Sequence, residues 1–339
     1  DIFIENGADS DILYLQHPHL GTDKLKEIIP SIRNKIIKMG GEFRFSTKLT
    51  DIKIENEKVV AVTLNDKEQL PCNVLILAIG HSARDTFHLL DDKNLLMESK
   101  PFAVGVRVMH YQKMIDKEQY QNKIKKAPYK LTYQTKNHRG VYSFCMCPGG
   151  YVINSASENN SLVVNGMSNY LRDSNTANSA IVVTVSKKDY GEGLFAGVKY
   201  QQELEKKAYL KGNGKIPVEY YQDFLNKKIT KKETDFAILG AYTFTDLNDI
   251  LPVTISDSIK EAMIEFNKKI KNFSDSNPLL AGVETRTSSP IKIIRDEKLE
   301  SNIKGIYPCG EGSGYAGGIT SSAIDGIKVA EEIIKKYYY

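Results

Sequence analysis

Hydrophobic positions between residues 22 and 39 recur at the three- and four-residue spacing of a helix with one apolar face. Thr22 and Asp23 carry side-chain oxygens suited to capping the first turn, and Gly40–Gly41 predicts the end of the helix near Met39. Pro30 lies inside the pattern, so we expect a kink or a broken first turn there. The apolar face consists of Leu25, Ile28, Ile29, Ile32 and Ile36.

Alternating polar and apolar residues follow and predict strands, because successive side chains of a strand point to opposite faces. The segments with this pattern are Glu42–Ser46, Asp51–Glu55 and Val59–Leu64. Asn73–Gly80 is instead a continuous apolar run that ends in glycine. Such runs are typical of parallel strands covered on both faces, and the glycine allows a tight exit where a ligand can approach the backbone. By periodicity alone, a short buried helix is the alternative.

Residues 98–280 are less regular, richer in Lys, Asn and Tyr, and contain several short apolar runs typical of strands. Helices are expected there over Gln201–Leu210 and Asp257–Phe273. From residue 281 onward the chain returns to a strand, Ile303–Tyr307, followed by a glycine-rich turn and a long helix. The pattern therefore predicts an α/β fold (α+β overall) that is interrupted by a β-rich segment.

The composition narrows the class of protein. The chain has 339 residues, long enough for two domains, and its 41% hydrophobic and 26% charged residues indicate a globular core. Lys and Arg exceed Asp and Glu by 46 to 42, and this net charge of +4 provides no electrostatic argument for nucleic-acid binding. No apolar stretch is long enough for a transmembrane helix, the first residues lack a signal-peptide pattern, and four cysteines favour a reducing, cytoplasmic location.

The strongest chemical signal is a turn with five glycines between residues 310 and 318, directly before the final helix. Glycine lets the backbone fold closely against a flat or anionic group, and the helix directs its free N–H groups and positive dipole end to the same place. This arrangement suits a phosphate or an electron-rich carbonyl such as the flavin C2 oxygen. Glu311 disfavours a phosphate but can accept hydrogen bonds from ribose or ribityl hydroxyls. The alternative is a structural loop with a solvated Glu311.

Cys145 and Cys147 would share one face of an extended strand, an arrangement that permits a redox pair. The alternatives are a buried pair of free thiols or a pocket lining. No second pair of cysteines or histidines is placed to complete a zinc site, so no metal is expected.

Histidine and arginine side chains provide three further candidates. His81 follows the apolar run, where ligands gather in open α/β sheets; the alternative is a helix-start residue with a satisfied ring. His19 is a second candidate for facing a pocket. Arg286 lies in the polar segment Glu284–Pro290, where it can clamp a substrate carboxylate or stabilise the charge of a reduced flavin, or form a structural ion pair.

Several blocks of the sequence resemble bacterial FAD-dependent dehydrogenases of the NAD(P)/FAD-dependent oxidoreductase family, an uncharacterised group distantly related to glutathione-reductase-type flavoproteins. The blocks are long, ordered and spread over the whole chain, so the match is far more specific than one glycine motif. They are His17–Asp23, Ala78–Phe87, Lys100–Arg107, Tyr142–Gly150, Asn165–Ser168, Ala177–Ala180, Glu284–Pro290 and Gly310–Gly318.

The resemblance implies a discontinuous, Rossmann-like FAD-binding domain formed by residues 1–97 and 281–339, and an inserted substrate or cap domain formed by residues 98–280. It places Gly80 and His81 near the adenosine of FAD, and the turn at residues 310–319 against the ribityl and isoalloxazine parts. The cofactor-binding candidates are Gly80, His81, Gly310, Glu311, Gly312, Gly317, Gly318 and Ile319, and the catalytic candidates are His81, Arg286, Cys145 and Cys147.

Family members carry an earlier βαβ unit with a G-x-G-x-x-G turn, which this sequence lacks, so we expect the chain to be an N-terminally truncated piece. The intact protein is expected to be an FAD-dependent oxidoreductase that transfers a hydride through flavin N5, with an unidentified small-molecule substrate and NAD(P)H as a candidate electron donor. Two alternatives stand beside it: a cofactor-free binding or scaffold module of the same fold, and a flavin-dependent RNA-modifying protein.

Overall fold

The computed structural model describes residues 1–14, 20–121, 123 and 126–338 of the chain. Contacts within the chain divide it into two compact units, each built from three separate segments. Both units mix helices and strands, so the fold class is α/β, as the hydrophobic pattern predicts. Unit 1 comprises Asp1–Phe43, Val104–Thr184 and Leu204–Thr285, and unit 2 comprises Arg44–Ala103, Val185–Glu203 and Arg286–Tyr339.

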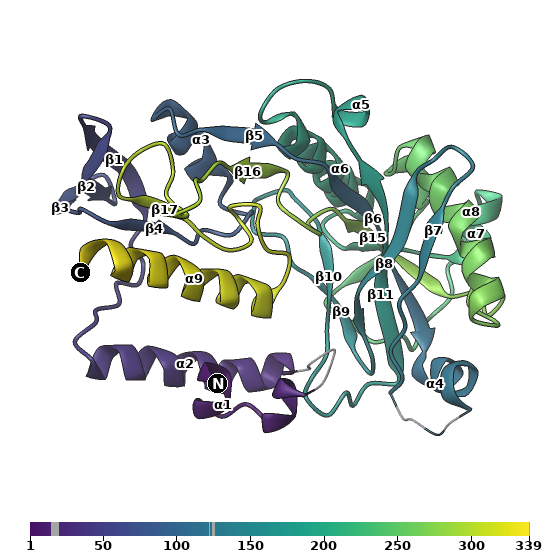
Figure 1. Ribbon diagram of the computed structural model, residues 1–339. Coiled ribbons are helices and arrows are strands. Elements are labelled where there is room, and N and C mark those ends of the chain that lie inside the picture. Colours follow the sequence, from purple (N-terminus) through teal and green to yellow (C-terminus); the bar gives the residue numbers. More distant parts are fainter. Residues whose placement is uncertain (15–19, 122, 124–125, 339) are drawn as a thin grey trace. The chain divides into compact units, whose positions relative to one another are not determined.

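Unit 1 is built around a seven-stranded mixed sheet in the order β14-β12-β15-β6-β11-β8-β7 (Figure 1). β12 pairs in parallel with β14 and antiparallel with β15, which is in turn antiparallel to β6. The long strands β6 and β11 are buried along almost their whole length, and buried polar residues such as Arg107 and Asn178 interrupt their apolar side chains. The bounds are Tyr242–Phe244, Ile216–Tyr220, Leu279–Glu284, Phe102–Tyr111, Thr176–Val185, Gly140–Cys147 and Thr132–Gln134, in the order of the sheet.

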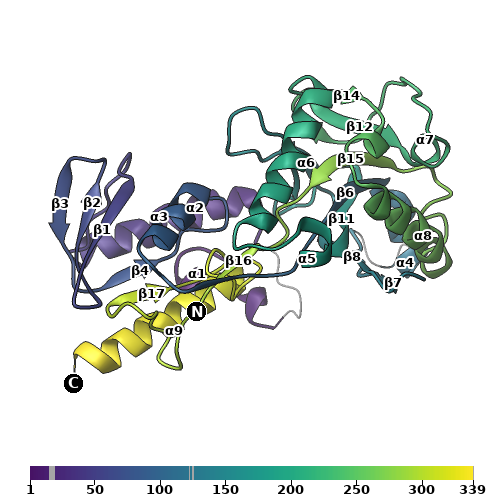
Figure 2. The same cartoon turned by 90° about the horizontal axis from the view of Figure 1, so that it is seen from above.

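A second sheet of unit 1 has the order β10-β9-β13, and helix α8 packs against β7 and β8 (Figure 2). These strands span Val164–Met167, Tyr151–Asn154 and Ile238–Leu239. The helices of this unit are α1 (Ile2–Glu5), η1 (Ser10–Leu13), α2 (Thr22–Lys38), α4 (Gln112–Tyr120), α7 (Tyr221–Asn226), η2 (Leu247–Asp249) and α8 (Val253–Lys269). Helix α6 (Ala196–Gly212) begins in unit 2 and continues into unit 1.

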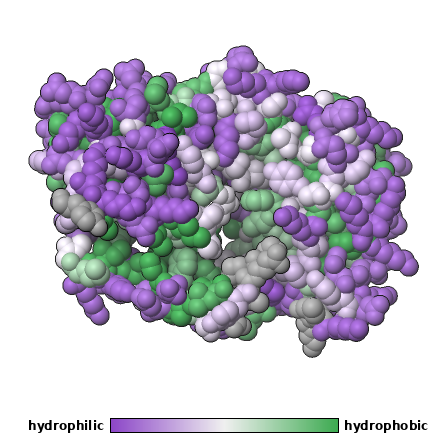
Figure 3. Space-filling view, viewed as in Figure 1, coloured by the Kyte–Doolittle hydropathy of each residue, from purple (hydrophilic) through white to green (hydrophobic). Residues whose placement is uncertain are grey.

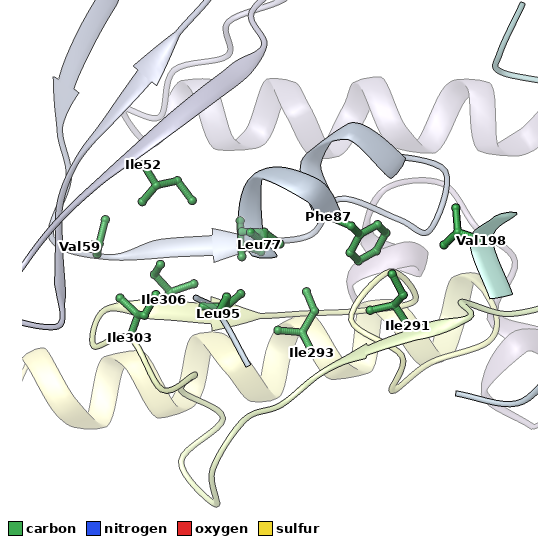
Figure 4. Close-up of a cluster of buried hydrophobic side chains, with 11 residues drawn as sticks. Ile52, Val59, Leu77, Phe87, Leu95, Val198, Ile291, Ile293, Ile303 and Ile306 are labelled. Carbon is green, nitrogen blue, oxygen red and sulfur yellow. The ribbon is translucent and has the colours of Figure 1, made fainter. Parts of the chain in front are cut away.

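Unit 2 contains three small sheets: antiparallel β1-β2-β3, the parallel pair β4 and β17, and the antiparallel pair β5 and β16. Its core gathers apolar side chains from these sheets and from helix α3, among them Leu77, Phe87 and Ile306 (Figure 4). The strands β1 to β5 span Leu49–Glu55, Lys58–Leu64, Glu68–Pro71, Leu75–Leu77 and Met97–Ser99. The remaining elements are α3 (Arg84–Asp92), α5 (Lys187–Tyr190), β16 (Ile291–Ile293), β17 (Ile306–Pro308) and α9 (Ile319–Tyr337).

The element predictions hold for the long, strongly periodic segments. The helix predicted from residue 22 is α2, and it continues through Pro30 without the expected break. The helix predicted over Asp257–Phe273 is α8, displaced toward the N-terminus. The strand predicted over Glu42–Ser46 is wrong: that segment pairs with no strand in the part of the chain described, because alternation alone supplies no hydrogen-bonding partner.

The apolar run Asn73–Gly80 is a strand only over Leu75–Leu77, and Ile76 is 46% exposed rather than covered. Its parallel partner β17 agrees with the predicted parallel pairing, whereas the Rossmann-like assignment stays a prediction. The compact units also have other bounds than the predicted domains, since residues 1–43 belong to unit 1. Helix α2 is tied to that unit by a hydrogen bond from Thr22 N to Ser168 O, 3.0 Å long.

Candidate functional site

Two parallel strands of unit 2 deliver their following loops to one edge of the structure. β4 and β17 pair from Leu75 opposite Ile306 to Leu77 opposite Pro308. Gly80 and His81 follow β4 and lead into α3, and the glycine-rich turn follows β17 and leads into α9 (Figure 1). The carboxyl ends of parallel strands are where ligands bind in open α/β sheets, so this edge is the candidate site.

Three of the five glycines shape the turn itself. Gly310 and Gly314 have φ angles of 77° and 85°, in the left-handed region that side chains disfavour. A Cβ on Gly312 would lie 2.6 Å from the carbonyl carbon of Gly80, so only glycine allows the two loops to touch. These three glycines therefore have a structural reason, while the cofactor-binding role expected of Gly310 and Gly312 stays a prediction.

The other two glycines lie at the open end of helix α9. A Cβ on Gly317 would meet no atom within 4 Å, and Gly317, Gly318 and Ile319 are all exposed. Gly318 precedes the first helical residue, and its carbonyl accepts the Ser322 N–H at 2.9 Å. The first-turn N–H groups and the positive dipole end of a 19-residue helix therefore face open space here.

His81 and Glu311 join the two loops. One Glu311 carboxylate oxygen accepts the His81 backbone N–H at 2.9 Å, and the other pairs with the ring atom Nδ1. Burial raises the pKa of Glu311, but the bonds to His81 outweigh it and leave that pKa below its usual value. The opposite ring atom, Nε2 of His81, is buried and has no hydrogen-bond partner among the described residues. Glu311 is thus engaged with His81 rather than solvated.

Two cations lie beside this pair. Arg286 donates from Nη1 to Ser82 Oγ at 2.9 Å, which places it next to His81. Lys100 donates from Nζ to the Gly314 carbonyl at 2.7 Å, and burial lowers the pKa of Lys100. The sequence singled out Arg286 but not Lys100, which lies far from the turn along the chain.

A buried ion pair anchors the turn to helix α9. Arg295 binds both carboxylate oxygens of Asp325, at 3.0 and 2.6 Å, and its guanidinium stacks 3.8 Å from the Tyr315 ring centroid. Asp325 also accepts the Gly310 N–H at 2.8 Å. Burial raises the pKa of Asp325, but the hydrogen bonds from Arg295 and Gly310 together lower it by more. The net shift of this pKa is therefore downward. Sequence reasoning missed this pair, because its partners lie 30 residues apart in unremarkable segments.

A second polar cluster lies in the sheet of unit 1 around Arg107. Its guanidinium is completely buried and binds Glu284 through Nε at 2.8 Å and through Nη2 at 3.4 Å. Nη1 donates to the carbonyl of Cys145 at 2.8 Å and to Asn178 Oδ1 at 3.1 Å, and Nη2 donates to Asn165 Oδ1 at 3.0 Å. Burial lowers the pKa of Arg107, but the charge of Glu284 more than offsets it, so Arg107 stays charged.

Cys145 and Cys147 belong to this cluster and not to the turn of unit 2. Cys145 is exposed, Cys147 is buried, and both are free thiols. Cys147 Sγ lies 3.4 Å from the Cys145 carbonyl and 3.9 Å from Arg107 Nη1. A hydrogen bond from the Cys147 thiol and the charge of Arg107 hold the pKa of Cys145 well below its usual value. The same hydrogen bond, together with burial, raises the pKa of Cys147.

The structure thus brings Gly80, His81, Arg286 and the 310–312 turn together within unit 2, and the two cysteines belong to unit 1. His17 and His19 lie outside the described residues. Within the described part of the chain, no group of three or more His, Cys, Asp or Glu residues is arranged to hold a metal ion. Every helix in that part is too short or too polar to cross a lipid bilayer.

Comparison with known proteins gives a family match and one curated relative. The family described as "FAD-dependent protein, C-terminal domain-like" matches residues 101–287, more than half of the chain. A protein of uncharacterised function from Clostridium beijerinckii is 45% identical over 349 aligned positions, which cover 99% of this chain and 65% of that protein. The chain therefore spans about two thirds of its relative.

Solved structures with a partial likeness are all distant. L-Proline dehydrogenase from P. horikoshii shares 13% identity, covering 92% of this chain and 55% of that one, at a TM-score of 0.38. An oxidoreductase from Methanosarcina mazei shares 11% identity over 90% and 54% of the two chains, at a TM-score of 0.37. The flavin-dependent brominase Bmp2 shares 12% identity, covering 91% of this chain and 54% of that one, at a TM-score of 0.36. At such TM-scores the likeness supports no argument about fold or function.

Proposed function

The chain belongs to the family of FAD-dependent proteins with this C-terminal domain, and from that premise we propose that it is part of an FAD-dependent oxidoreductase. We place the flavin at the edge of unit 2 where Gly80–His81 and the glycine-rich turn meet. Two observations carry this placement: the open, two-glycine start of helix α9, and the buried Nε2 of His81, which has no hydrogen-bond partner among the described residues. His81 lies on the loop that contacts the same turn through Glu311.

The residues at this edge fit a flavin. The first turn of α9 offers backbone N–H donors for an electron-rich carbonyl, and Gly317 and Gly318 leave the space that a planar ring needs. His81 Nε2 is a polar ring atom in need of a hydrogen-bond partner, which a hydroxyl or amide of the cofactor would supply. Bound FAD would supply hydride transfer at its N5 atom.

The protein's own side chains would orient the His81 ring and stabilise negative charge on the bound group. Glu311 fixes the His81 ring by accepting from both its backbone N–H and Nδ1, so that Nε2 keeps one direction. Arg286 and Lys100 supply positive charge close to that ring and favour a negatively charged bound group. The substrate is proposed to be a small molecule, with NAD(P)H as a candidate donor of electrons. The cofactor-free scaffold and the RNA-modifying protein are not favoured, because the family is FAD-dependent.

Flavin binding tests the proposal directly. The purified chain and the full Clostridium beijerinckii relative are titrated with FAD, and visible absorption and quenching of flavin fluorescence report binding. We expect flavin bands in the relative and saturable quenching in at least that protein. In a protein that binds FAD, a leucine in place of the glycine equivalent to Gly317 should weaken binding roughly tenfold, because its side chain fills the open space at α9.

Gly326→Ala is the matched control on the same helix. A Cβ at this position would lie 3.6 Å from Cys309 Sγ, an ordinary contact, so folding and FAD affinity should both stay unchanged. Absence of flavin from both proteins would sink the oxidoreductase proposal and promote the scaffold alternative. Flavin binding that Gly317→Leu leaves unchanged would retain the activity class but move the cofactor away from the start of α9.

A further inference from the structure

The two cysteines of β8 lie at a β-bulge. Asn178 of β11 pairs with Cys147, while Ala180 pairs with Phe144, so Cys145 and Met146 together face a single residue of the neighbouring strand. Cys145 has a φ of 45°, in the left-handed region, and its side chain is exposed although the alternate residues of the strand are buried. The bulge thus turns one thiol outward while the next one stays inside.

Arg107 holds this distorted segment in place. Its Nη1 binds the carbonyl of Cys145 itself, and the same atom lies 3.9 Å from the sulfur of Cys147. The guanidinium is fixed in turn by Glu284 and Asn178, all three residues being at least 97% buried. The guanidinium packs directly against Gly166 and leaves no space for a side chain there, since a Cβ on Gly166 would lie 2.3 Å from Nη1 of Arg107. A buried cation is therefore aimed at the backbone and sulfur of a C-x-C pair.

The two thiols differ in the way that an attacking and a resolving thiol must. The exposed Cys145 lies near the positive charge of Arg107, which favours its thiolate, and its pKa is held well below the usual value. Burial raises the pKa of Cys147, which therefore keeps its proton, and its thiol donates to the Cys145 carbonyl at 3.4 Å. Neither Cys72 nor Cys309 has this environment, because burial raises the pKa of each.

We propose that Cys145 and Cys147 form a dithiol that exchanges with small disulfides, with Cys145 attacking and Cys147 resolving. The Cys145 thiolate attacks one sulfur of the disulfide, forms a mixed disulfide and releases one thiolate, which takes a proton from water. Cys147 then attacks Cys145 Sγ, loses its proton to the second leaving thiolate and forms the Cys145–Cys147 disulfide. The protein loses two electrons, and the small disulfide gains them to become two thiols.

A bulge of this kind eases the strain that such a ring would otherwise carry. On a regular strand, the Cα atoms of residues i and i+2 are about 6.6 Å apart. This is close to about 6.8 Å, the upper limit of the Cα–Cα distance across a disulfide. The bulge bends the strand at Cys145, and the Cys147 sulfur lies 3.4 Å from the Cys145 carbonyl oxygen. The activity goes beyond the proposed flavin function and needs no flavin.

Reaction with dithiobis(nitrobenzoate) and then with oxidised glutathione tests the proposal on the full 339-residue chain. Each exchange is followed by the thiolate released and by mass spectrometry of the unreduced protein and its peptides. We expect a fast phase that releases two thiolates per chain, leaves no adduct and removes two hydrogens from the peptide with both cysteines. Cys147→Ser should release one thiolate and retain the adduct on Cys145, and Cys145→Ser should react at least roughly tenfold more slowly.

Cys72→Ser is the control and should keep the fast two-thiolate phase, since Cys72 is not part of the cluster. Circular dichroism of each variant confirms that the fold is retained. A wild-type chain that keeps a stable mixed disulfide would overturn the resolving role of Cys147. A fast phase that survives in Cys145→Ser would overturn the whole proposal, and either result leaves the flavin assignment untouched because no flavin is added.

Discussion

Two arginine–carboxylate pairs, one in each unit, have different structural roles. Arg107 of unit 1 is completely buried and distributes its N–H groups over Glu284, Asn165, Asn178 and a backbone carbonyl. Arg295 of unit 2 binds Asp325 through two parallel bonds and stacks on Tyr315. The first pair stiffens the interior of a sheet, whereas the second fastens a loop to the start of a helix.

The two carboxylates, Glu284 and Asp325, have pKa values shifted in opposite directions. Burial dominates at Glu284 and raises its pKa despite the charge of Arg107, whereas at Asp325 the bonds from Arg295 and Gly310 prevail and its pKa is lowered. Around Arg107, protein groups accept hydrogen bonds from all three guanidinium nitrogens, and Cys145 is the exposed member of the cluster. Near Asp325 the turn exposes two glycines, and the loop that contacts the turn holds the buried Nε2 of His81, which has no hydrogen-bond partner among the described residues. Each site holds one buried nitrogen without a hydrogen-bond partner among the described residues, Nε2 of His81 in one and Nδ2 of Asn178 in the other. The open backbone at the start of α9 is what distinguishes the candidate ligand site.

The largest expected effect comes from removing the buried cation. Arg107→Met should destabilise the chain by about 3–5 kcal/mol, because Glu284 is left buried without its partner. The midpoint and slope of urea denaturation measure the change. Lys211→Met removes a cation from an exposed pair of the same unit and should cost about 0.5 kcal/mol or less.

The double variant Arg107→Met with Glu284→Gln sharpens this prediction. If the cost comes from the unpaired carboxylate, the second substitution should recover a large part of the stability lost in the first. A double variant that is no more stable than Arg107→Met alone would mean that the hydrogen bonds to Cys145 and Asn178, rather than the ion pair, carry the stabilisation.

The second-largest effect concerns the anchor of the turn. Asp325→Asn should cost about 2–3 kcal/mol at neutral pH, since Arg295 loses its bidentate partner. The folded-state pKa of Asp325 is lowered, so its stabilisation is present above the unfolded pKa and is lost as the pH falls through the folded value. Denaturation at neutral pH and at about pH 3 should therefore show a large difference from the wild type that shrinks in acid. A difference that grows in acid would contradict the direction of this shift.

The smallest effects compare two glycines of one turn. Gly312→Ala should cost about 1–3 kcal/mol, because the new methyl group would lie 2.6 Å from the backbone of Gly80. Gly317→Ala meets no atom within 4 Å and should change the free energy of unfolding by about 0.5 kcal/mol or less. Thermal and urea denaturation of the two variants side by side measure the contrast. Equal losses would show that the turn is not packed against Gly80 as described.

The sequence anticipated those features that depend on local repetition. The apolar spacing of α2 and α8, and the glycines before α9, are visible along the chain because a helix face or a tight turn involves neighbouring residues. It also singled out His81, Glu311 and Arg286, though without their contacts. The strand expected over Glu42–Ser46 failed, because a strand needs a partner that its own sequence does not contain.

Long-range packing decided the rest. Helix α9 leaves apolar side chains partly exposed at Ile324 and Ile327, while Asp325 and Val329 are buried. Figure 3 shows that hydrophobic surface occurs among the hydrophilic side chains on this face of the molecule. The hydrophobic pattern could not reveal that Asp325 is buried while two isoleucines are exposed, since the cation that pairs with Asp325 lies 30 residues away in the sequence. Likewise, Arg107 meets Glu284 across 177 residues. Local pattern determines which elements form, but the energy of a buried charge depends on partners that only the folded chain brings within bonding distance.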